Sequence, residues 1–259
     1  MIKIRNILYV VAGIPVFIIL LWVFAIPGNL IEEKIEDAVA MSGNSNMSLS
    51  ISGLKKGIFF ALYADDLNFK IDNKPALNIT GFAGNFSPRY LARGRIAFTV
   101  TGKIGAGDID GIIKLPLEGS IKIDRAELSA IPYLTQFGIN IDGNVYADIY
   151  INNDVVKAIF EVPDLNIDDT GSVFPLLNTF RKLQGALSIK GNTLKIDSIS
   201  LEGEKGFARL KGDITNGVMN LSLELMPDTR KLNVMESMLI GKYIVSPGYY
   251  IVPVKGPLP

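Results

Sequence analysis

The sequence predicts a mainly β protein. An N-terminal transmembrane helix is followed by a curved antiparallel β-sheet, which forms an open groove or half-barrel with a few short capping helices. Three observations support this fold class: an uncharged apolar run near the N-terminus, alternation of apolar and polar residues from Met47 onward, and Gly, Asn and Asp between the alternating runs. The 259 residues are enough for one large β domain or two small ones with a sizeable core.

The apolar run extends from Ile7 to Ile26 and contains no charged residue. Its length is about the 20 residues that a helix needs to cross a bilayer core. Pro15 lies in the middle of the run, where a membrane helix tolerates proline better than a soluble helix does. Trp22 lies near the far end, where aromatic anchors are common. We therefore predict a transmembrane helix from Ile7 to Ile26.

The flanking charges predict how this helix is oriented. Lys3 and Arg5 precede the run, and an acidic segment follows it at residues 32–37. The positive-inside rule therefore places the N-terminus in the cytoplasm and the bulk of the chain on the other side of the membrane. A cleaved signal peptide is the alternative, because Val23-Phe24-Ala25 weakly matches a cleavage site. The run is, however, longer than the usual apolar stretch of about 7–15 residues in such peptides.

Three segments follow from these boundaries. Residues 1–29 form a cytoplasmic tip and the transmembrane anchor, residues 30–46 a juxtamembrane helix and joint, and residues 47–259 the β domain. Between Leu30 and Ala40, apolar residues recur at helical spacing with acidic residues between them. The stretch MSGNSN at residues 41–46 is rich in turn-forming residues and predicts a joint.

The β domain is predicted from runs with a period of two, as in MSLSIS, LNFKID, RIAFTV, NVYADIYI and NLSLEL. Gly191-Asn192, Asn216-Gly217 and Asp142-Gly143 fit tight hairpin turns. The apolar positions change parity between Ile196 and Ile199, which would put them on opposite faces of a regular strand. A bulge near Asp197-Ser198 would return them to one face and bend the sheet, so we expect a curved sheet.

Short helices are expected to interrupt the meander and to cap the sheet. One begins at Ser87-Pro88, because serine favours the N-cap and proline the first helical position. Three more are predicted over residues 131–137, 174–183 and 229–240 from their apolar spacing.

Composition excludes several classes of chemistry. The chain has no Cys and no His, which rules out thiolate or imidazole metal sites, cysteine nucleophiles and histidine-based triads. Asp108 and Asp110 begin like a calcium loop but lack its later ligands, and Asp168-Asp169 fits a turn or helix cap. Lys plus Arg and Asp plus Glu both number 26, so no net charge favours nucleic acid as a partner. We expect no enzyme, no cofactor and no metal.

The apolar side of the predicted sheet is the candidate functional surface. Two interpretations remain open: the closed core of a sandwich, or a hydrophobic groove that holds lipid tails. In the second case, the candidate groove residues are Leu187, Ile189, Leu194, Ile196, Leu221, Leu223 and Leu225.

The chain resembles a known family in its apolar rhythm and glycine placement. The resemblance lies in the anchor, in MSLSISGLKKGIFFALYADDLNFK, in AELSAIPYLTQFGINIDGNVYADI, and in GALSIKGNTLKIDSISLEGEKGFARLKGDITNGVMNLSLELMP with the closing YYIVPVKGPLP. Together these resemble the long form of the type II secretion system protein N family. The pattern is also similar to AsmA-like envelope proteins, which have an inner-membrane anchor and a curved periplasmic sheet implicated in phospholipid movement.

The resemblance implies a location and partners. It implies a single-pass protein of the Gram-negative inner membrane, with its N-terminus in the cytoplasm and residues 47–259 in the periplasm. The partners would be the membrane and other envelope proteins of the secretion system. The role would be structural, or, by the AsmA-like similarity, the binding or transfer of phospholipid. The family offers no catalytic residues to carry over.

Overall fold

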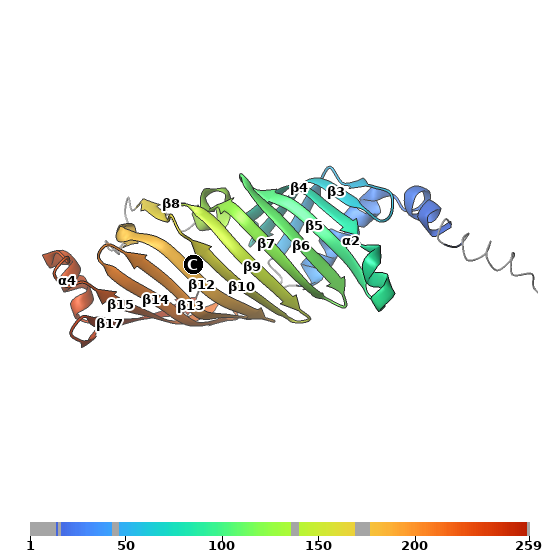
Figure 1. The fold of residues 1–259 in the computed structure, drawn as a ribbon. Coiled ribbons are helices and arrows are strands. Elements are labelled where there is room, and N and C mark those ends of the chain that lie inside the picture. Colours follow the sequence, from blue (N-terminus) through green and yellow to red (C-terminus); the bar gives the residue numbers. More distant parts are fainter. Residues whose placement is uncertain (1–13, 15–16, 43–46, 136–139, 169–176, 258–259) are drawn as a thin grey trace, which may run out of the picture.

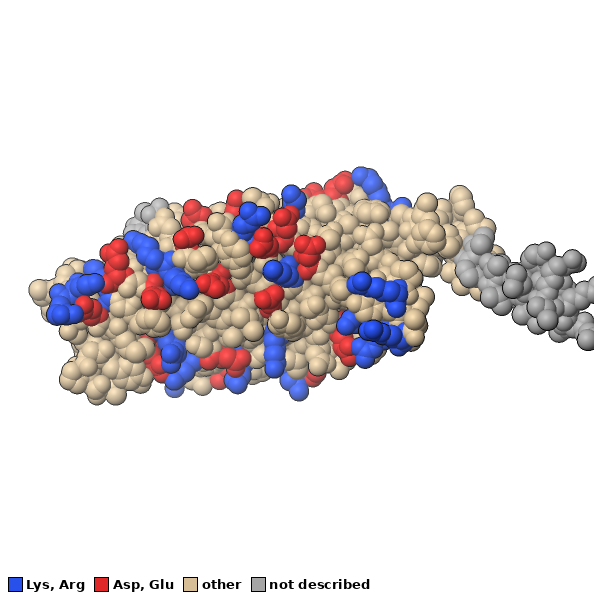
Figure 2. Space-filling view, viewed as in Figure 1, with Lys and Arg blue, Asp and Glu red and all other residues tan. Residues whose placement is uncertain are grey.

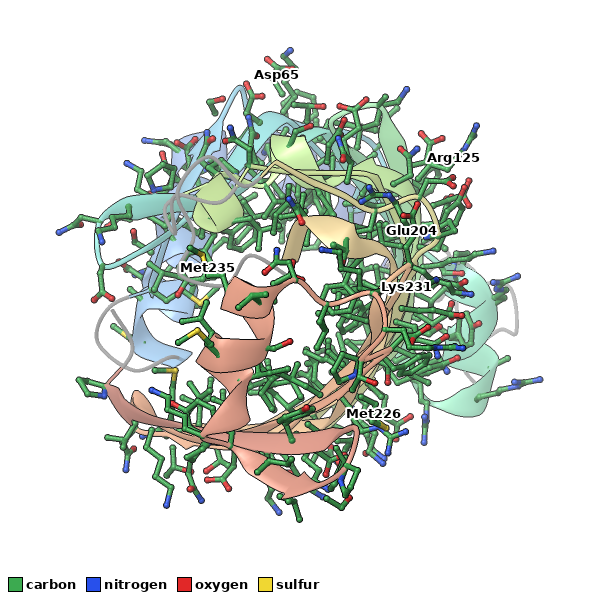
Figure 3. All side chains as sticks on the ribbon, turned by 90° about the vertical axis from the view of Figure 1, so that its left-hand side faces the viewer. Asp65, Arg125, Glu204, Met226, Lys231 and Met235 are labelled. Atoms are coloured by element: carbon green, nitrogen blue, oxygen red, sulfur yellow. The ribbon has the colours of Figure 1, made fainter. Side chains whose placement is uncertain are left out.

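The computed structural model describes residue 14 and residues 17–42, 47–135, 140–168 and 177–257. In these residues the chain is mainly β, with one large antiparallel sheet and a few short helices, which confirms the predicted class at this level. The sheet is long and twisted, with the N-terminal segment at one end and α4 (Val234–Gly241) at the other (Figure 1). Seen along its length, it winds around a long axis (Figure 3).

Strand order follows chain order almost throughout, because successive runs are joined by tight turns. Across the large sheet the strands are β1 (Met47–Ser52), β3 (Leu62–Ile71), β4 (Lys74–Phe86), β5 (Ile96–Ile104), β6 (Gly107–Leu115), β7 (Glu118–Glu127), β9 (Asn144–Asn152), β10 (Val155–Val162), β12 (Phe180–Lys190), β13 (Thr193–Gly203), β14 (Gly206–Thr215), β15 (Val218–Pro227), β17 (Tyr249–Pro257) and β16 (Ile244–Ser246). In addition, β2 (Lys55–Lys56) pairs with β3, and β8 (Asn140–Asp142) pairs with β11 (Asn166–Asp168) as a separate ribbon.

Two of the three predicted hairpin turns are confirmed. Asn216 and Gly217 join β14 to β15 with φ of 52° and 75°, the left-handed pair that suits a type I′ turn. Gly191 joins β12 to β13 with φ of 53°. The hairpin predicted at Asp142-Gly143 is wrong, because β8 and β9 belong to different sheets. Gly143 instead lets the chain cross between them at φ 139°, where a Cβ atom would lie 2.8 Å from the Asp164 carbonyl oxygen.

The predicted bulge in β13 is also present. Ile196 pairs with Gly212 and Ile199 with Leu210, so Asp197 and Ser198 fill a gap that takes one residue on β14. The register against β12 shifts at the same place. Ile196 and Ile199 therefore share one face of the sheet although their numbers differ in parity.

The helices are short and differ in part from prediction. The described ones are η1 (Leu21–Ala25), α2 (Gly28–Ser42), η2 (Pro88–Arg93), η3 (Leu128–Ala130), α3 (Pro132–Thr135), η4 (Leu177–Thr179) and α4. The helix predicted over 174–183 is confirmed only as the short η4 at Leu177–Thr179 and is wrong from Phe180 onward, where β12 begins; residues 174–176 lie outside the described residues. Leu183 pairs with Val162 on one side and Leu201 on the other, and this pairing outweighs its helical spacing.

The predicted membrane helix is only partly visible. Much of the stretch from Ile7 to Ile26 lies outside the described residues. Among the residues that are described, we find no helix with both the length and the apolar character needed to span a bilayer. The helix predicted from Leu30 to Ala40 is present within α2, and most of the predicted joint, residues 43–46, lies outside the described residues.

The strand ends form two rims with different roles. Because successive antiparallel strands reverse direction, their connections alternate between the rims. One rim, here called the lid rim, carries η3, α3, β8, β11, η4 and α4. The other, here called the turn rim, carries the loop at 57–61, η2, and the short turns at 116–117, 153–154, 191–192 and 216–217. The elements able to cover the sheet therefore gather mainly along one side.

The start of α4 is fixed by three side chains. The Asn233 side chain accepts the backbone N–H of Glu236 at 2.7 Å, and Glu236 accepts the backbone N–H of Asn233 at 2.8 Å. Lys205, from the β13–β14 turn, donates to the buried Glu236 carboxylate at 2.6 Å. Burial alone would raise the pKa of Glu236, but the hydrogen bonds from Lys205 and Asn233 outweigh it and hold the pKa below its ordinary value. Close by, Lys231 donates to the Glu204 carbonyl at 2.9 Å (Figure 3).

We expect Asn233→Ala to loosen α4 while the sheet stays folded. Loss of the N-cap hydrogen bond costs about 1 kcal/mol, which corresponds to a roughly fivefold larger equilibrium constant for opening of the helix and so to roughly fivefold faster amide exchange. Hydrogen exchange of the α4 amides measures this directly. Ser237→Ala, an exposed change on the same helix, is the control and should leave exchange unchanged. Equal protection in the two variants would show that the cap does not hold α4.

Candidate functional site

The strongest candidate site is the apolar face of the large sheet. Strand pairing aligns side chains into rows that run across ten strands, from β5 to β17. The middle row consists of Val100, Gly111, Ile121, Ile149, Ala158, Leu187, Ile196, Gly212, Leu221 and Val254. Directly paired residues point to the same side of a sheet, so these side chains lie on one face.

Two further rows flank the middle one. Toward the turn rim lie Phe98, Ile113, Gly119, Ile151, Val156, Ile189, Leu194, Ile214, Met219 and Gly256. Toward the lid rim lie Gly102, Ile109, Ile123, Ala147, Phe160, Gly185, Ile199, Leu210, Leu223 and Val252. The three rows contain no side chain that is charged or able to form a hydrogen bond.

On this face, burial is greatest beside the lid rim and least beside the turn rim. The side chains nearest the lid rim are buried: Val162 and Ala208 are each 1% exposed and Leu225 is 4% exposed. No apolar side chain of the turn-rim row is fully buried, and Ile189 is 41% exposed. Along β9 the burial alternates with every residue: the side chains of the apolar face are half-buried and those of the other face are exposed. A closed core would bury the apolar set throughout, so this face is covered along one side only.

The covering side chains come from the lid rim and from α2. Ile240 of α4 is buried in the cluster that includes Val162 and Leu225, with Leu232 and Tyr243 packed against it. The β8–β11 ribbon adds further apolar contacts to that cluster. Ile131, beside α3, packs near Ile104 and Ile109, and Ile35 and Val39 of α2 pack over β1 and β3. These contacts explain why the rows are buried where they are.

The structure brings all seven predicted groove residues to this face. Leu225 lies by the lid rim, and Leu223 in the row beside it. The middle row contains Leu187, Ile196 and Leu221, and the turn-rim row contains Ile189 and Leu194. Ile196, Leu221 and Leu225 are buried, Leu187, Leu194 and Leu223 half-buried, and Ile189 exposed.

Sequence reasoning missed the larger part of the same face. Strands β5–β10 contribute as many positions as β12–β17, and their alternation is visible in RIAFTV and NVYADIYI. Glycines at inward positions hide this pattern, because they break the apolar alternation. Gly185 shows their use: a Cβ atom there would lie 2.6 Å from Cζ of Phe160, so the absence of a side chain makes room for the aromatic ring.

The opposite face of the sheet is polar. Lys and Arg are interspersed with Asp and Glu over the strands in Figure 2. Glu224 is only 6% exposed there, covered by Lys211 and Arg209 from the neighbouring strand. The hydrogen bond from Lys211 is the main reason that the pKa of Glu224 lies below its ordinary value, against the opposing effect of burial.

The polar face also has hollows lined in part by charged side chains. Two shallow hollows of about 400 and 420 Å³ lie on it, and both are lined by Lys122 and Asp148. Among the described residues, no group of three or more acidic side chains is placed to hold a metal ion. Asp108 and Asp110 lie on β6 and do not form a loop, because their backbone pairs with both β5 and β7.

Two lysine substitutions distinguish a one-sided face from a closed core. Ile196→Lys should cost about 3–5 kcal/mol, because it leaves an unpaired charge in a buried position. Ile189→Lys, two strand positions away on the neighbouring strand, should cost about 0.5 kcal/mol or less, because its ammonium reaches water along the flexible stem. Thermal melts followed by circular dichroism would measure both. Equal destabilisation would contradict the one-sided burial described above.

Comparisons with protein-family models, with curated proteins and with solved structures found no match to this chain. The similarity to the type II secretion protein N family therefore stays a prediction from the sequence. The feature of the described residues that bears most on function is the set of uncharged rows, which are least buried toward the turn rim.

Proposed function

We propose that the apolar face is an open groove that binds the acyl chains of lipids. The observation that supports this is the set of three rows, each of ten positions, without a single side chain able to form a hydrogen bond. One edge of these rows is left half-buried at the turn rim. A ligand for this surface has to be long and apolar, because nothing on it would satisfy polar groups.

An acyl chain fits this surface better than a polypeptide does. A peptide laid on the face would bring backbone N–H and C=O groups that need partners. The backbone groups of the sheet are directed at neighbouring strands, and the side chains of the rows offer no replacement. A hydrocarbon chain needs no hydrogen-bond partner and gains from leaving water.

The dimensions suit more than one chain. Ten strands spaced about 4.8 Å apart give rows about 43 Å long, and successive rows lie about 6.7 Å apart. The acyl chains of one leaflet extend about 15 Å, half of a hydrocarbon core of about 30 Å. The groove would thus hold two or more acyl chains end to end.

The proposed location follows from the N-terminal sequence. We infer that Ile7 to Ile26 anchors the protein once in the inner membrane of a Gram-negative cell, with residues 1–29 forming the tip and anchor. Residues 30–46 would follow on the far side of the membrane, and residues 47–259 would form the periplasmic groove. Two observations favour this: the uncharged length of the run, and the basic residues that precede it.

Photocrosslinking tests the groove with the full chain. A phospholipid with a photoreactive group in its acyl chain should label peptides of β9–β15. Leu223→Lys should reduce this labelling at least about fivefold, because a charged group on the apolar face opposes burial of a hydrocarbon chain. The variant should still fold, since Leu223 is half-buried and a lysine there can reach water.

Asn220→Lys is the matched control for this experiment. It lies on the same strand but on the exposed polar face, so labelling should stay at the original level. Circular dichroism of both variants checks that the sheet is intact. Undiminished labelling of a folded Leu223→Lys variant would show that the lipid does not occupy this face.

A second candidate function is supported by the far end of the sheet. Six apolar side chains of α4 and its surroundings are each at least 44% exposed and are here called the tip patch: Val234, Met235, Met238, Leu239, Ile244 and Val245. Figure 3 shows Met235 turned away from Lys231 and Glu204. Flexible methionines suit an adaptable protein contact. This favours a structural role in the type II secretion apparatus, with another envelope subunit on the tip patch.

A photoreactive residue at Met238 tests that role in cells. We expect adducts with a subunit of the secretion apparatus, and none from the same probe at Asn220. Met235→Lys combined with Met238→Lys should lower release of secreted proteins, because two charges would have to be buried at the contact. Normal release, together with no adduct to any secretion subunit, would remove this candidate.

A further inference from the structure

The loop at residues 57–61 and the N-terminal segment meet at one end of the sheet. Trp22 Nε1 donates to the Gly57 carbonyl at 2.9 Å, and its ring lies 5.2 Å from that of Phe60. Lys56 donates to the carbonyls of Trp22 at 2.7 Å and Val23 at 3.1 Å, and also to that of Ile26. These contacts fix the end of the predicted anchor against the turn rim.

A row of aromatic side chains, each in contact with the next, continues from Phe60 into the sheet. Phe60 lies 5.8 Å from Phe86, and Phe86 lies 5.8 Å from Phe98, the first position of the turn-rim row. Phe59 and Phe60 both have positive φ, 56° and 60°, a conformation unusual for aromatic residues. With this backbone, Phe60 packs inward and Phe59 points out, with 63% of its surface exposed.

Exposed apolar side chains surround this end of the sheet. They come from the 57–61 loop, from η2 and from the adjoining ends of β5 and β6, and each is at least 45% exposed: Ile58, Phe59, Leu91, Ile96, Leu115 and Leu117. Strand pairing places these segments next to one another, since β3, β4, β5 and β6 are consecutive in the sheet. Ile96 and Leu115 are themselves a pair.

Basic residues accompany them. Arg89 and Lys114 lie over the Tyr90 ring at 5.1 and 5.5 Å, and Arg93 lies on the same short helix. Among the described residues, Arg89, Arg93 and Lys114 form no ion pair with a carboxylate, whereas the neighbouring Arg95 pairs with Glu118. Lys and Arg gather over η2 at the end of the molecule nearest the N-terminal segment (Figure 2).

We propose that this end of the sheet, here called the basal patch, docks on the surface of an anionic phospholipid membrane. The apolar side chains would enter the boundary between headgroups and acyl chains, and Arg89, Arg93 and Lys114 would pair with lipid phosphates. A protein partner would not account for the position of the patch beside the end of the predicted anchor. The docking is a second membrane contact, distinct from the anchor, and does not depend on the groove holding lipid.

The test uses the full chain with a single introduced cysteine, which is straightforward because the chain has none of its own. Leu91→Cys carries an environment-sensitive fluorophore, and the vesicles contain phosphatidylcholine with brominated acyl chains, with or without phosphatidylglycerol. We expect contact quenching that requires phosphatidylglycerol. Arg89→Gln with Arg93→Gln should weaken docking roughly 30-fold, since each basic residue near an anionic surface contributes about fivefold.

Val218→Cys is the matched control, because Val218 is also apolar, lies at the turn rim and is 55% exposed, close to the 52% of Leu91. Its label should stay unquenched. No quenching at Leu91 would overturn the proposal. Quenching that is equally strong without phosphatidylglycerol and in the double arginine variant would show that the patch does not require an anionic surface. Quenching at both positions would show the whole turn rim lying on the bilayer and would overturn docking by this end.

Discussion

The rest of the structure depends on the unbroken pairing of antiparallel strands from β1 to β17. Side chains alternate between faces with a period of two, so one slip of register would exchange the apolar and polar sets of every later strand. The bulge at Asp197-Ser198 keeps the apolar side chains on one face, because without it Ile199 would point to the face opposite Ile196. The uncharged rows are therefore a cumulative result of the pairing, and no single strand could supply them.

The second determinant is the difference between the connections at the two rims. Insertions at the lid rim supply α4, the β8–β11 ribbon and η3 with α3, and the buried side chains cluster beneath them. The turn rim has mostly two-residue turns, which leave nothing to fold over the face. The buried side chains thus lie largely toward the lid rim and under α2, and the apolar side chains at the turn rim stay half-buried or exposed. The same asymmetry supports both the proposed groove and the basal patch, where the turn rim meets the N-terminal segment.

Much of the sheet could be predicted from local sequence. Period-two runs, the Asn216-Gly217 turn and the parity change after Ile196 each have a local physical cause, and the structure agrees with all three. The error at Asp142-Gly143 arose because a turn sequence does not say whether the next strand returns beside the last one. The predicted helix over 174–183 fails from Phe180 onward because pairing with β10 and β13 outweighs local spacing. The basal patch was invisible to sequence reasoning, since it joins loops far apart in the chain.

The last strand carries a consequence for self-association. An open sheet presents a free edge at each end, and such edges invite another chain to add on. Successive residues of β17 direct their N–H groups to alternate sides, and Ile251 donates outward to the Tyr243 carbonyl at 3.0 Å. The next outward positions are Pro253, Lys255 and Pro257, of which only the lysine has an N–H group to offer. Beyond the three-residue β16, the edge of β17 therefore offers few N–H groups to a further strand, which disfavours end-to-end pairing of copies of this chain.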